Sequence, residues 1–165
     1  MSEVASQQNE LIRLADRQGG AGKSLLVRIL GRHAPVTPLG HGRLDCEIVA
    51  TTEALTARFV TVLTEHHLIE WEAALERLSR REAVRWLDEE HGPELRVEPG
   101  RPGGVWVTVS DAEDSGVTLR FILSPAPGWL EEQHALLKLV REGCPTEAVE
   151  LSPDVHAWRT SLDEA

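Results

Sequence analysis

The chain has 165 residues, of which 41% are hydrophobic and 27% are charged, a composition typical of one globular domain. Its longest apolar runs are far shorter than the ~20 residues that span a bilayer, so we expect no membrane partner. The formal net charge of −10 argues against a nucleic-acid partner, because phosphate binding needs clustered Lys and Arg. The same charge is compatible with a basic protein partner.

Residues 1–10 are polar and lack the basic and apolar regions of a signal peptide, so we expect a cytoplasmic protein. We divide the chain into a flexible N-terminus at 1–9, a single α+β domain at 10–143 and a C-terminal tail at 144–165, partly ordered or frayed. The two cysteines are too few and too isolated for a disulfide framework or a zinc site. Cys46 is predicted to lie in the core, and Cys144 to be a free thiol near a helix end.

Alternating apolar and polar residues predict four strands in the first half of the chain, at 11–16, 24–31, 43–50 and 57–63. The third strand has the clearest pattern, because Leu44, Cys46 and Ile48 alternate with charged side chains. A glycine-rich turn at 18–22 joins the first two strands, and a loop with two prolines and two glycines at 32–42 leads to the third.

Helical spacing begins after Thr64, a residue type that suits an N-cap, and predicts an amphipathic helix over about 65–81 with Trp71 on its apolar face. Four short apolar runs then predict two hairpins, with strands at 83–87, 94–97, 105–109 and 117–123. A second amphipathic helix is predicted over about 127–142, ending at Gly143.

These elements predict an α+β fold with a curved, mostly antiparallel sheet of about seven or eight strands and two amphipathic helices. The strands follow one another through short turns without a helix between each pair, which favours antiparallel pairing over a doubly wound parallel sheet. That order argues against most nucleotide-binding architectures.

One segment resembles the phosphate-binding loop of P-loop ATPases, in particular the form with paired glycines found in partition-type ATPases. Five residues carry this resemblance: Gly19, Gly20, Gly22, Lys23 and Ser24. Both forms of the motif are broken, because Arg17 replaces the glycine of the standard loop and Gln18 replaces the lysine of the variant. The residues after Ser24 also leave barely two helical turns before Gly31. We therefore interpret the segment as a glycine-rich hairpin turn, and keep nucleotide binding through these five residues as the alternative function.

No metal site or catalytic residue is predicted. The seven histidines include no helical i, i+4 pair and no His-x-His, and His66 and His67 at the start of a helix are expected to have a solvated, capping role. The acidic turn at 111–114 lacks the ligand spacing of a calcium loop. Ser, His and Asp show no order that indicates a catalytic triad. We therefore expect no cofactor, and favour a noncatalytic protein over an enzyme.

The chain has five tryptophans and no tyrosine. Trp71 is predicted to be a core residue. Trp106 is out of step with the valines at 105, 107 and 109, so we expect its side chain to face away from the core. An exposed tryptophan near charged residues is typical of a partner interface, although a helix or the tail could equally cover it.

The order of several segments resembles an uncharacterised family of small actinobacterial proteins, over about residues 10–142. The resemblance rests on 11–16, 27–32, 44–49, 71–75, 84–87, 107–109 and 116–118. It implies that residues 18–24 are a variable turn between two strands. The layout also resembles immunity proteins that neutralise toxins of competing bacteria, but neither resemblance assigns a functional residue.

Three functions follow from the sequence. The leading hypothesis is a noncatalytic protein-interaction module, one form of which is an immunity protein that binds a basic toxin. The alternative is a nucleotide-binding protein or NTPase. The third is a structural or regulatory homodimer. The sequence does not determine the partner or the oligomeric state.

Overall fold

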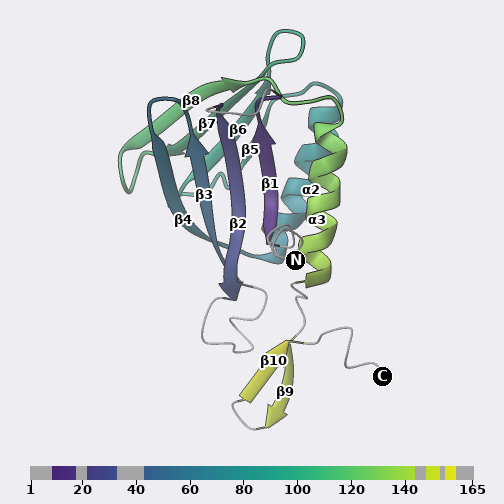
Figure 1. The fold of residues 1–165 in the computed structure, drawn as a ribbon. Coiled ribbons are helices and arrows are strands. Elements are labelled where there is room, and N and C mark those ends of the chain that lie inside the picture. The colour runs from purple at the N-terminus through teal and green to yellow at the C-terminus, as the bar shows by residue number, and fades with distance from the viewer. Residues whose placement is uncertain (1–8, 18–21, 33–42, 144–147, 153–154, 159–165) are drawn as a thin grey trace.

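The computed structural model describes residues 9–17, 22–32, 43–143, 148–152 and 155–158. Two four-stranded antiparallel sheets and two helices make up the main body (Figure 1). The first sheet has the order β1 (Glu10–Ala15), β2 (Ser24–Arg32), β3 (Leu44–Thr51) and β4 (Thr56–Leu63). The second sheet has the order β5 (Val84–Trp86), β6 (Glu94–Pro99), β7 (Val105–Asp111) and β8 (Val117–Leu123).

Helix α2 (Glu65–Ser79) connects the two sheets, and α3 (Trp129–Gly143) follows β8. A separate antiparallel pair, β9 (Ala148–Ser152) and β10 (Val155–Trp158), lies in the region predicted as a partly ordered tail. The predicted α+β class, the antiparallel pairing and both helices are confirmed. The eight strands of the main body are divided between two sheets, whereas the sequence pattern suggested one. No helix in the described ranges is long and apolar enough to cross a membrane.

The core is one contiguous cluster with contributions from both sheets and both helices. Alternation along the strands produces it: in β7, Val105, Val107 and Val109 are buried, and Trp106 lies between them on the other face. Cys46 and Trp71 are both fully buried, so their predicted core positions are confirmed. Burial raises the pKa of the Cys46 thiol to about 12. Cys144 lies outside the described residues.

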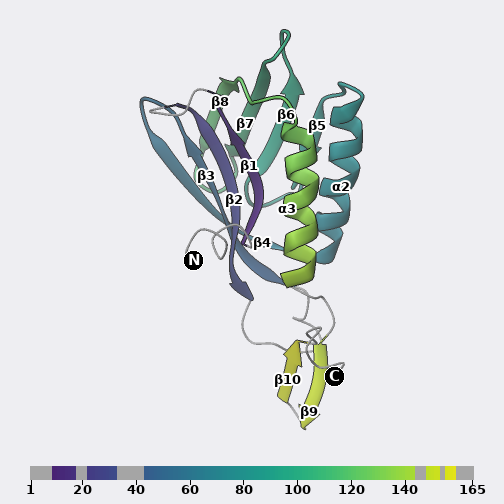
Figure 2. The same cartoon turned by 45° about the vertical axis from the view of Figure 1, so that its right-hand side comes forward.

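The helices lie side by side along one flank of the sheets (Figure 2), where they cover two edge strands. Helix α3 packs on β1 through Gln133, which is fully buried. The Gln133 amide accepts a hydrogen bond from the Arg13 N–H at 2.9 Å and donates one to the Arg13 carbonyl at 2.8 Å. Helix α2 packs on β5, where Trp86 donates its indole N–H to the His67 carbonyl at 2.8 Å. The β1 edge is therefore paired with a helix side chain instead of a further strand, and the β5 edge is covered by α2.

The N-terminus of α2 is closed by His67. The Thr64 backbone N–H donates to His67 Nδ1 at 2.9 Å, so the ring proton is on Nε2, which donates to Glu89 Oε1 at 2.5 Å. His66 is exposed, as expected, but the prediction of a solvated role is wrong for His67, which is buried. The capping position of His67 was expected. Its imidazole ring is buried, and Glu89 from the β5–β6 turn is hydrogen-bonded to it.

Asp16 joins the two sheets at one end of the molecule. Its carboxylate accepts hydrogen bonds from the backbone N–H groups of Lys23 at 3.2 Å and Ser124 at 2.8 Å. The Arg17 N–H also donates to the Ser124 carbonyl at 2.8 Å. The end of β1, the start of β2 and the end of β8 are therefore held together here. The candidate site lies beside this junction.

Candidate ligand-binding cleft

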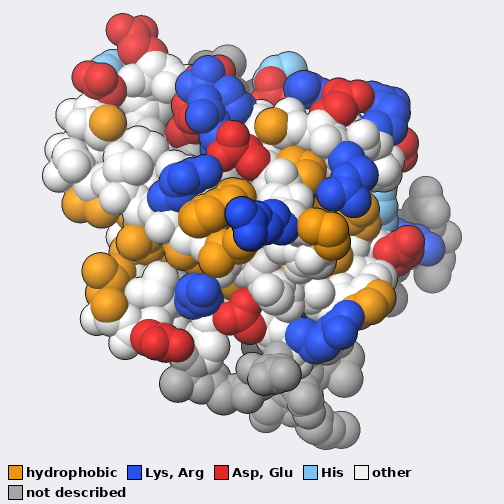
Figure 3. All heavy atoms as spheres, turned by 90° about the horizontal axis from the view of Figure 1, so that it is seen from above, with side chains coloured by type: hydrophobic (Ala, Val, Ile, Leu, Met, Phe, Trp, Pro, Cys, Tyr) orange, Lys and Arg blue, Asp and Glu red, His pale blue; other side chains and the backbone are white. Residues whose placement is uncertain are grey.

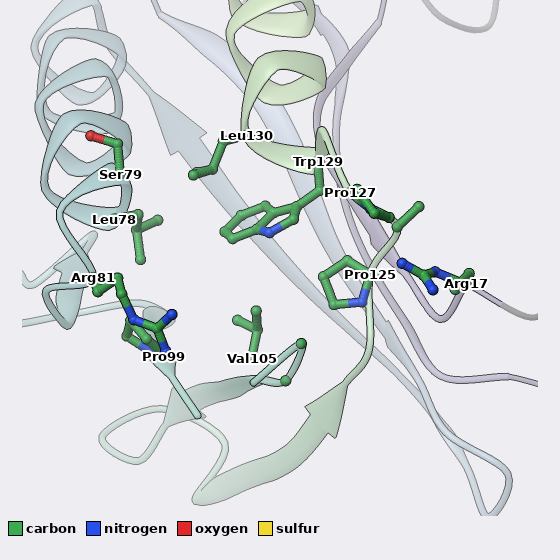
Figure 4. A pocket seen from close by; sticks show the side chains of 13 residues that line it. Arg17, Leu78, Ser79, Arg81, Pro99, Val105, Pro125, Pro127, Trp129 and Leu130 are labelled. Carbon is green, nitrogen blue, oxygen red and sulfur yellow. The ribbon is translucent and has the colours of Figure 1, made fainter. Parts of the chain in front are cut away.

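A cavity of about 280 Å³ opens beside the Asp16 junction (Figure 4). Its walls come from four segments: the end of α2, the β6–β7 loop, the residues between β8 and α3, and Arg17 after β1. The lining is mainly apolar, with the side chains of Leu78, Pro99, Val105, Pro125, Trp129 and Leu130 among its members. Figure 4 shows the Trp129 indole reaching into the middle of the cavity, with Arg17 and Arg81 on opposite sides.

A polar hollow of about 710 Å³ continues from this cavity and shares Arg17, Gly103 and Pro125 with it. Lys23, Gly22 and Glu53 line the hollow from the first sheet. We call the cavity and the hollow together the basic cleft. It therefore combines an apolar part around Trp129 with a polar part around Lys23.

The cations that line the basic cleft, Arg17, Lys23 and Arg81, outnumber its two acids, Asp16 and Glu53. These three cations, together with Arg101 in the β6–β7 loop, form no ion pair with any described residue. Both carboxylate oxygens of Asp16 accept backbone N–H groups. Seen from above, Lys and Arg side chains lie around an apolar patch, with Asp and Glu side chains between them (Figure 3). A protein of net charge −10 thus places several cations without a described ion-pair partner beside a partly apolar surface at this end.

Arg81 has a backbone conformation that normally favours glycine. Its φ is 61°, and it follows the C-cap of α2 in a Schellman motif. In this motif the Glu82 N–H donates to the Arg77 carbonyl at 3.0 Å, and the Arg81 N–H to the Leu78 carbonyl at 2.9 Å. A left-handed conformation costs a non-glycine residue roughly 1–2 kcal/mol. Strain of this kind clusters at functional sites, and here it accompanies a side chain that lines the cavity.

The neighbours of Arg81 are neutralised. Arg77 and Arg80 both donate to the Glu82 carboxylate, at 3.0 and 3.1 Å, and these hydrogen bonds lower the pKa of Glu82. Arg81 is therefore the one cation at the end of α2 without an ion-pair partner among the described residues.

The five residues of the P-loop resemblance are only partly described. Gly19 and Gly20 lie outside the described residues, Gly22 and Lys23 line the polar hollow, and Ser24 begins β2. The chain after Ser24 is an antiparallel strand, so the helix N-terminus on which a P-loop binds phosphate is not present there. The predicted pair of strands on either side of the turn is confirmed.

Trp106 projects from the outer face of the second sheet and is half-buried. The Arg120 guanidinium carbon lies 4.2 Å from the centre of its ring. The predicted outward direction of the Trp106 side chain is confirmed. A partner interface at Trp106 stays a prediction.

Thr64, His67 and Glu89 are arranged in the order of a catalytic triad, with Thr64 Oγ1 3.3 Å from His67 Nδ1. The arrangement cannot activate the hydroxyl, because the Thr64 backbone N–H already occupies the lone pair of Nδ1. These residues therefore cap a helix. Groups of three or more His, Cys, Asp or Glu that could hold a metal ion are absent from the described residues.

An acidic groove of about 470 Å³ lies at the opposite end of the second sheet, between the tips of the β5–β6 and β7–β8 turns. Four glutamates line it: Glu89, Glu90, Glu94 and Glu113. The Gly92 N–H donates to Asp114 at 3.1 Å and ties the two tips together. The second sheet thus has a basic end and an acidic end.

The sequence analysis did not find Arg81 or Trp129 as site residues. Arg81 gave no signal, because a left-handed arginine after a helix has no sequence signature. Pro125 and Pro127 were interpreted only as residues that end a strand. In the structure they line the cavity together with Trp129.

The fold and the cleft define an α+β protein with a basic, partly apolar cleft and, in its described part, no catalytic constellation. The chain belongs to a family of unknown function, DUF5959, whose model matches residues 9–145. None of the curated proteins matches the chain. The matched residues include both four-stranded sheets, both helices and the whole basic cleft, and they end before β9. The predicted resemblance to an uncharacterised family is thus confirmed at this level.

Proposed function

We propose that the protein is a noncatalytic binding module that takes an acidic peptide segment of a partner protein into the basic cleft. The observation that carries this proposal is the set of four cations without an ion-pair partner among the described residues: Arg17, Lys23, Arg81 and Arg101. Arg17 and Arg81 line the apolar cavity, Lys23 lines the polar hollow and Arg101 lies on the β6–β7 loop, on a chain of net charge −10. Unpaired cations beside an apolar surface favour a ligand that brings both negative charge and an apolar group.

The shape of the cleft favours a peptide over a small molecule. The apolar cavity of about 280 Å³ is at the lower limit of small-molecule pockets, and it opens sideways into the larger hollow. An extended segment can place one apolar side chain beside Trp129 and its carboxylates along Arg17 and Lys23. Tryptophan and arginine are also the residue types that contribute most to protein interfaces.

The polar groups of the cleft support binding and not catalysis. Asp16, the acid beside the cations, uses both carboxylate oxygens to hold backbone N–H groups, which gives it a structural role. Glu53 is exposed to solvent. No nucleophile in the described part of the cleft is hydrogen-bonded to a base.

The test is peptide binding measured by fluorescence anisotropy. The probe is a labelled peptide with one Trp flanked by two Glu on each side, and the control peptide has Lys in place of Glu. We expect binding of the acidic probe only, weakening as salt rises, and at least tenfold weaker in Arg17→Ala and in Arg81→Ala. Arg96→Ala is the matched control, because Arg96 also lacks an ion pair among the described residues but lies on the outer face of the second sheet. Binding that survives both cleft substitutions, or no binding of the acidic probe, contradicts the proposal.

Calorimetry with Mg-ATP and Mg-GTP tests the nucleotide alternative in the same cleft. Lys23 lines the polar hollow, so nucleotide binding that disappears in Lys23→Ala would assign the cleft to nucleotides. No heat with either nucleotide would leave the peptide as the ligand to be tested.

A second candidate is the binding of a basic protein, of which an immunity protein that neutralises a basic toxin is one case. The acidic groove at the other end of the second sheet favours it. The test is binding of basic products of neighbouring genes to the wild type and to a Glu90→Arg, Glu113→Arg variant. Loss of binding in the Glu90→Arg, Glu113→Arg variant, with binding by Arg81→Ala unchanged, supports this candidate. Equal binding by the wild type and the double variant contradicts it. The mass in solution tests a homodimer.

A further inference from the structure

The β6–β7 loop forms one wall of the basic cleft. Pro99, Gly103 and Gly104 line its apolar cavity, and Pro102 and Gly103 line its polar hollow. The loop is closed by two internal hydrogen bonds, from the Gly100 N–H to the Gly104 carbonyl at 2.9 Å and from the Gly104 N–H to the Arg101 carbonyl at 2.7 Å. Arg101, one of the unpaired cations, lies on this loop. The position of the loop therefore sets the width of the cleft.

The other side of the loop rests directly on side chains of the outer face of the second sheet. A Cβ on Gly100 would lie 3.3 Å from Trp106 Cδ1, and a Cβ on Gly104 would lie 3.2 Å from Ile122 Cδ1. Both distances are shorter than ordinary van der Waals contact. The glycine backbone is thus packed closely against Trp106 and Ile122, and a Cβ at either glycine would require its neighbours to move by a few tenths of an ångström.

Trp106 is itself held in place. Its neighbours across β6 and β8 are Glu98 and Ile122. The Arg120 guanidinium lies over its ring at 4.2 Å, and Arg120 is paired with Glu98 at 3.8 Å. Because Val105 lines the cleft and Trp106 points to the opposite face, the loop lies between the Trp106 ring and the cleft.

We propose that Trp106 is a positioning residue that fixes the β6–β7 loop as the wall of the basic cleft. It acts through Gly100 and touches no ligand. This inference rests on the proposed function for its effect on binding, but its effect on the loop is independent of any ligand. It gives Trp106 a role different from that of an interface anchor, and the two roles predict different results.

The first measurement is hydrogen exchange of the Gly100 and Gly104 amides in the unliganded protein, followed by NMR. In Trp106→Leu we expect both amides to exchange at least tenfold faster, because the contact that holds the loop is removed. Trp106→Phe keeps a ring and is expected to restore most of the protection. Thr108→Ala, on the same face of β7 but further from the loop, is the matched control and should leave the exchange unchanged. Unchanged exchange in Trp106→Leu overturns the proposal.

A double-mutant cycle distinguishes the specific contact from general destabilisation. Gly100→Ala should speed exchange of the loop amides in the wild type, since its Cβ meets Trp106. The same change should have a smaller effect in the Trp106→Leu protein, where the contact with Trp106 is gone and only the contact with the Gly104 carbonyl, whose oxygen lies 3.4 Å from the added Cβ, is left. Equal effects in both backgrounds overturn the proposed contact.

Binding of the acidic probe separates the two roles of Trp106. We expect affinity about tenfold lower in Trp106→Leu and largely restored in Trp106→Phe, in parallel with the exchange rates. Loss of binding without any change in loop exchange would mean that Trp106 touches the partner, and would overturn the positioning role. If the wild type binds no acidic probe, the proposed function fails, and the exchange rates alone decide the role of Trp106.

Discussion

Replacing Arg81 by glycine should make the protein more stable and a weaker binder at the same time. Arg81 has a φ of 61° at the position after the α2 C-cap where glycine is favoured. Relief of the left-handed strain is worth roughly 1–2 kcal/mol. The greater freedom of glycine in the unfolded chain costs about 0.5–1 kcal/mol, so the net gain is about 0–1.5 kcal/mol.

The assay is urea unfolding together with titration of the acidic probe. We expect a higher midpoint for Arg81→Gly at an unchanged m-value, and an affinity at least tenfold lower. Arg81→Ala should lose affinity equally but gain no comparable stability, because alanine keeps the unfavourable φ. Leu87, the other described non-glycine residue with positive φ, is buried, so Leu87→Gly should instead destabilise the protein by about 2 kcal/mol or more. A lower midpoint for Arg81→Gly, or equal midpoints for Arg81→Gly and Arg81→Ala, would refute the reasoning.

Three further predictions concern buried polar groups. Gln133→Glu should lower the free energy of unfolding at pH 7 by about 3 kcal/mol, measured by urea unfolding, because a carboxylate cannot donate to the Arg13 carbonyl. An unchanged free energy of unfolding would contradict the role of Gln133 in covering the β1 edge. The hydrogen bond from Arg28 lowers the pKa of Glu47 from 4.5, so its stabilisation is present above pH 4.5 and lost as pH falls through the lowered pKa. The stability difference between wild type and Glu47→Gln, about 1.5–3 kcal/mol at pH 7, should therefore shrink in acid; a constant difference down to pH 2 would contradict this. Iodoacetamide at pH 8 should label Cys46 only after unfolding, because burial raises its pKa to about 12; fast labelling of the folded protein, located by mass spectrometry, would contradict its burial.

Most elements of the fold could be predicted because their signal is local. The alternation at 43–50 predicts a strand, and the change to helical spacing after Thr64 predicts a helix. The strand was expected to be half-buried, but Glu47 and Val49 on its other face are buried too. The division into two sheets could not be predicted in the same way. Helix α2 separates β4 from β5, and no local pattern tells whether the chain then extends the first sheet or begins another.

The candidate site was beyond sequence reasoning for a physical reason. Its cations come from positions 17, 23 and 81, which only the packing of α2 and the two sheets brings to one end. The motif that drew attention, around Lys23, contributes one wall of a hollow. His67 was misjudged for the same reason, because its burial depends on Glu89, 22 residues away.

The Gln133 side chain makes the edge strand β1 behave as an interior strand. Its amide offers Arg13 one donor and one acceptor, as the backbone of a neighbouring strand would. Helix α3 is thus a cover against unwanted pairing as well as a part of the core. If the helix detached, the open backbone of β1 would become a template for another chain. Damage to α3 should therefore appear first as swapped dimers or insoluble protein, before any loss of secondary structure in the sheets.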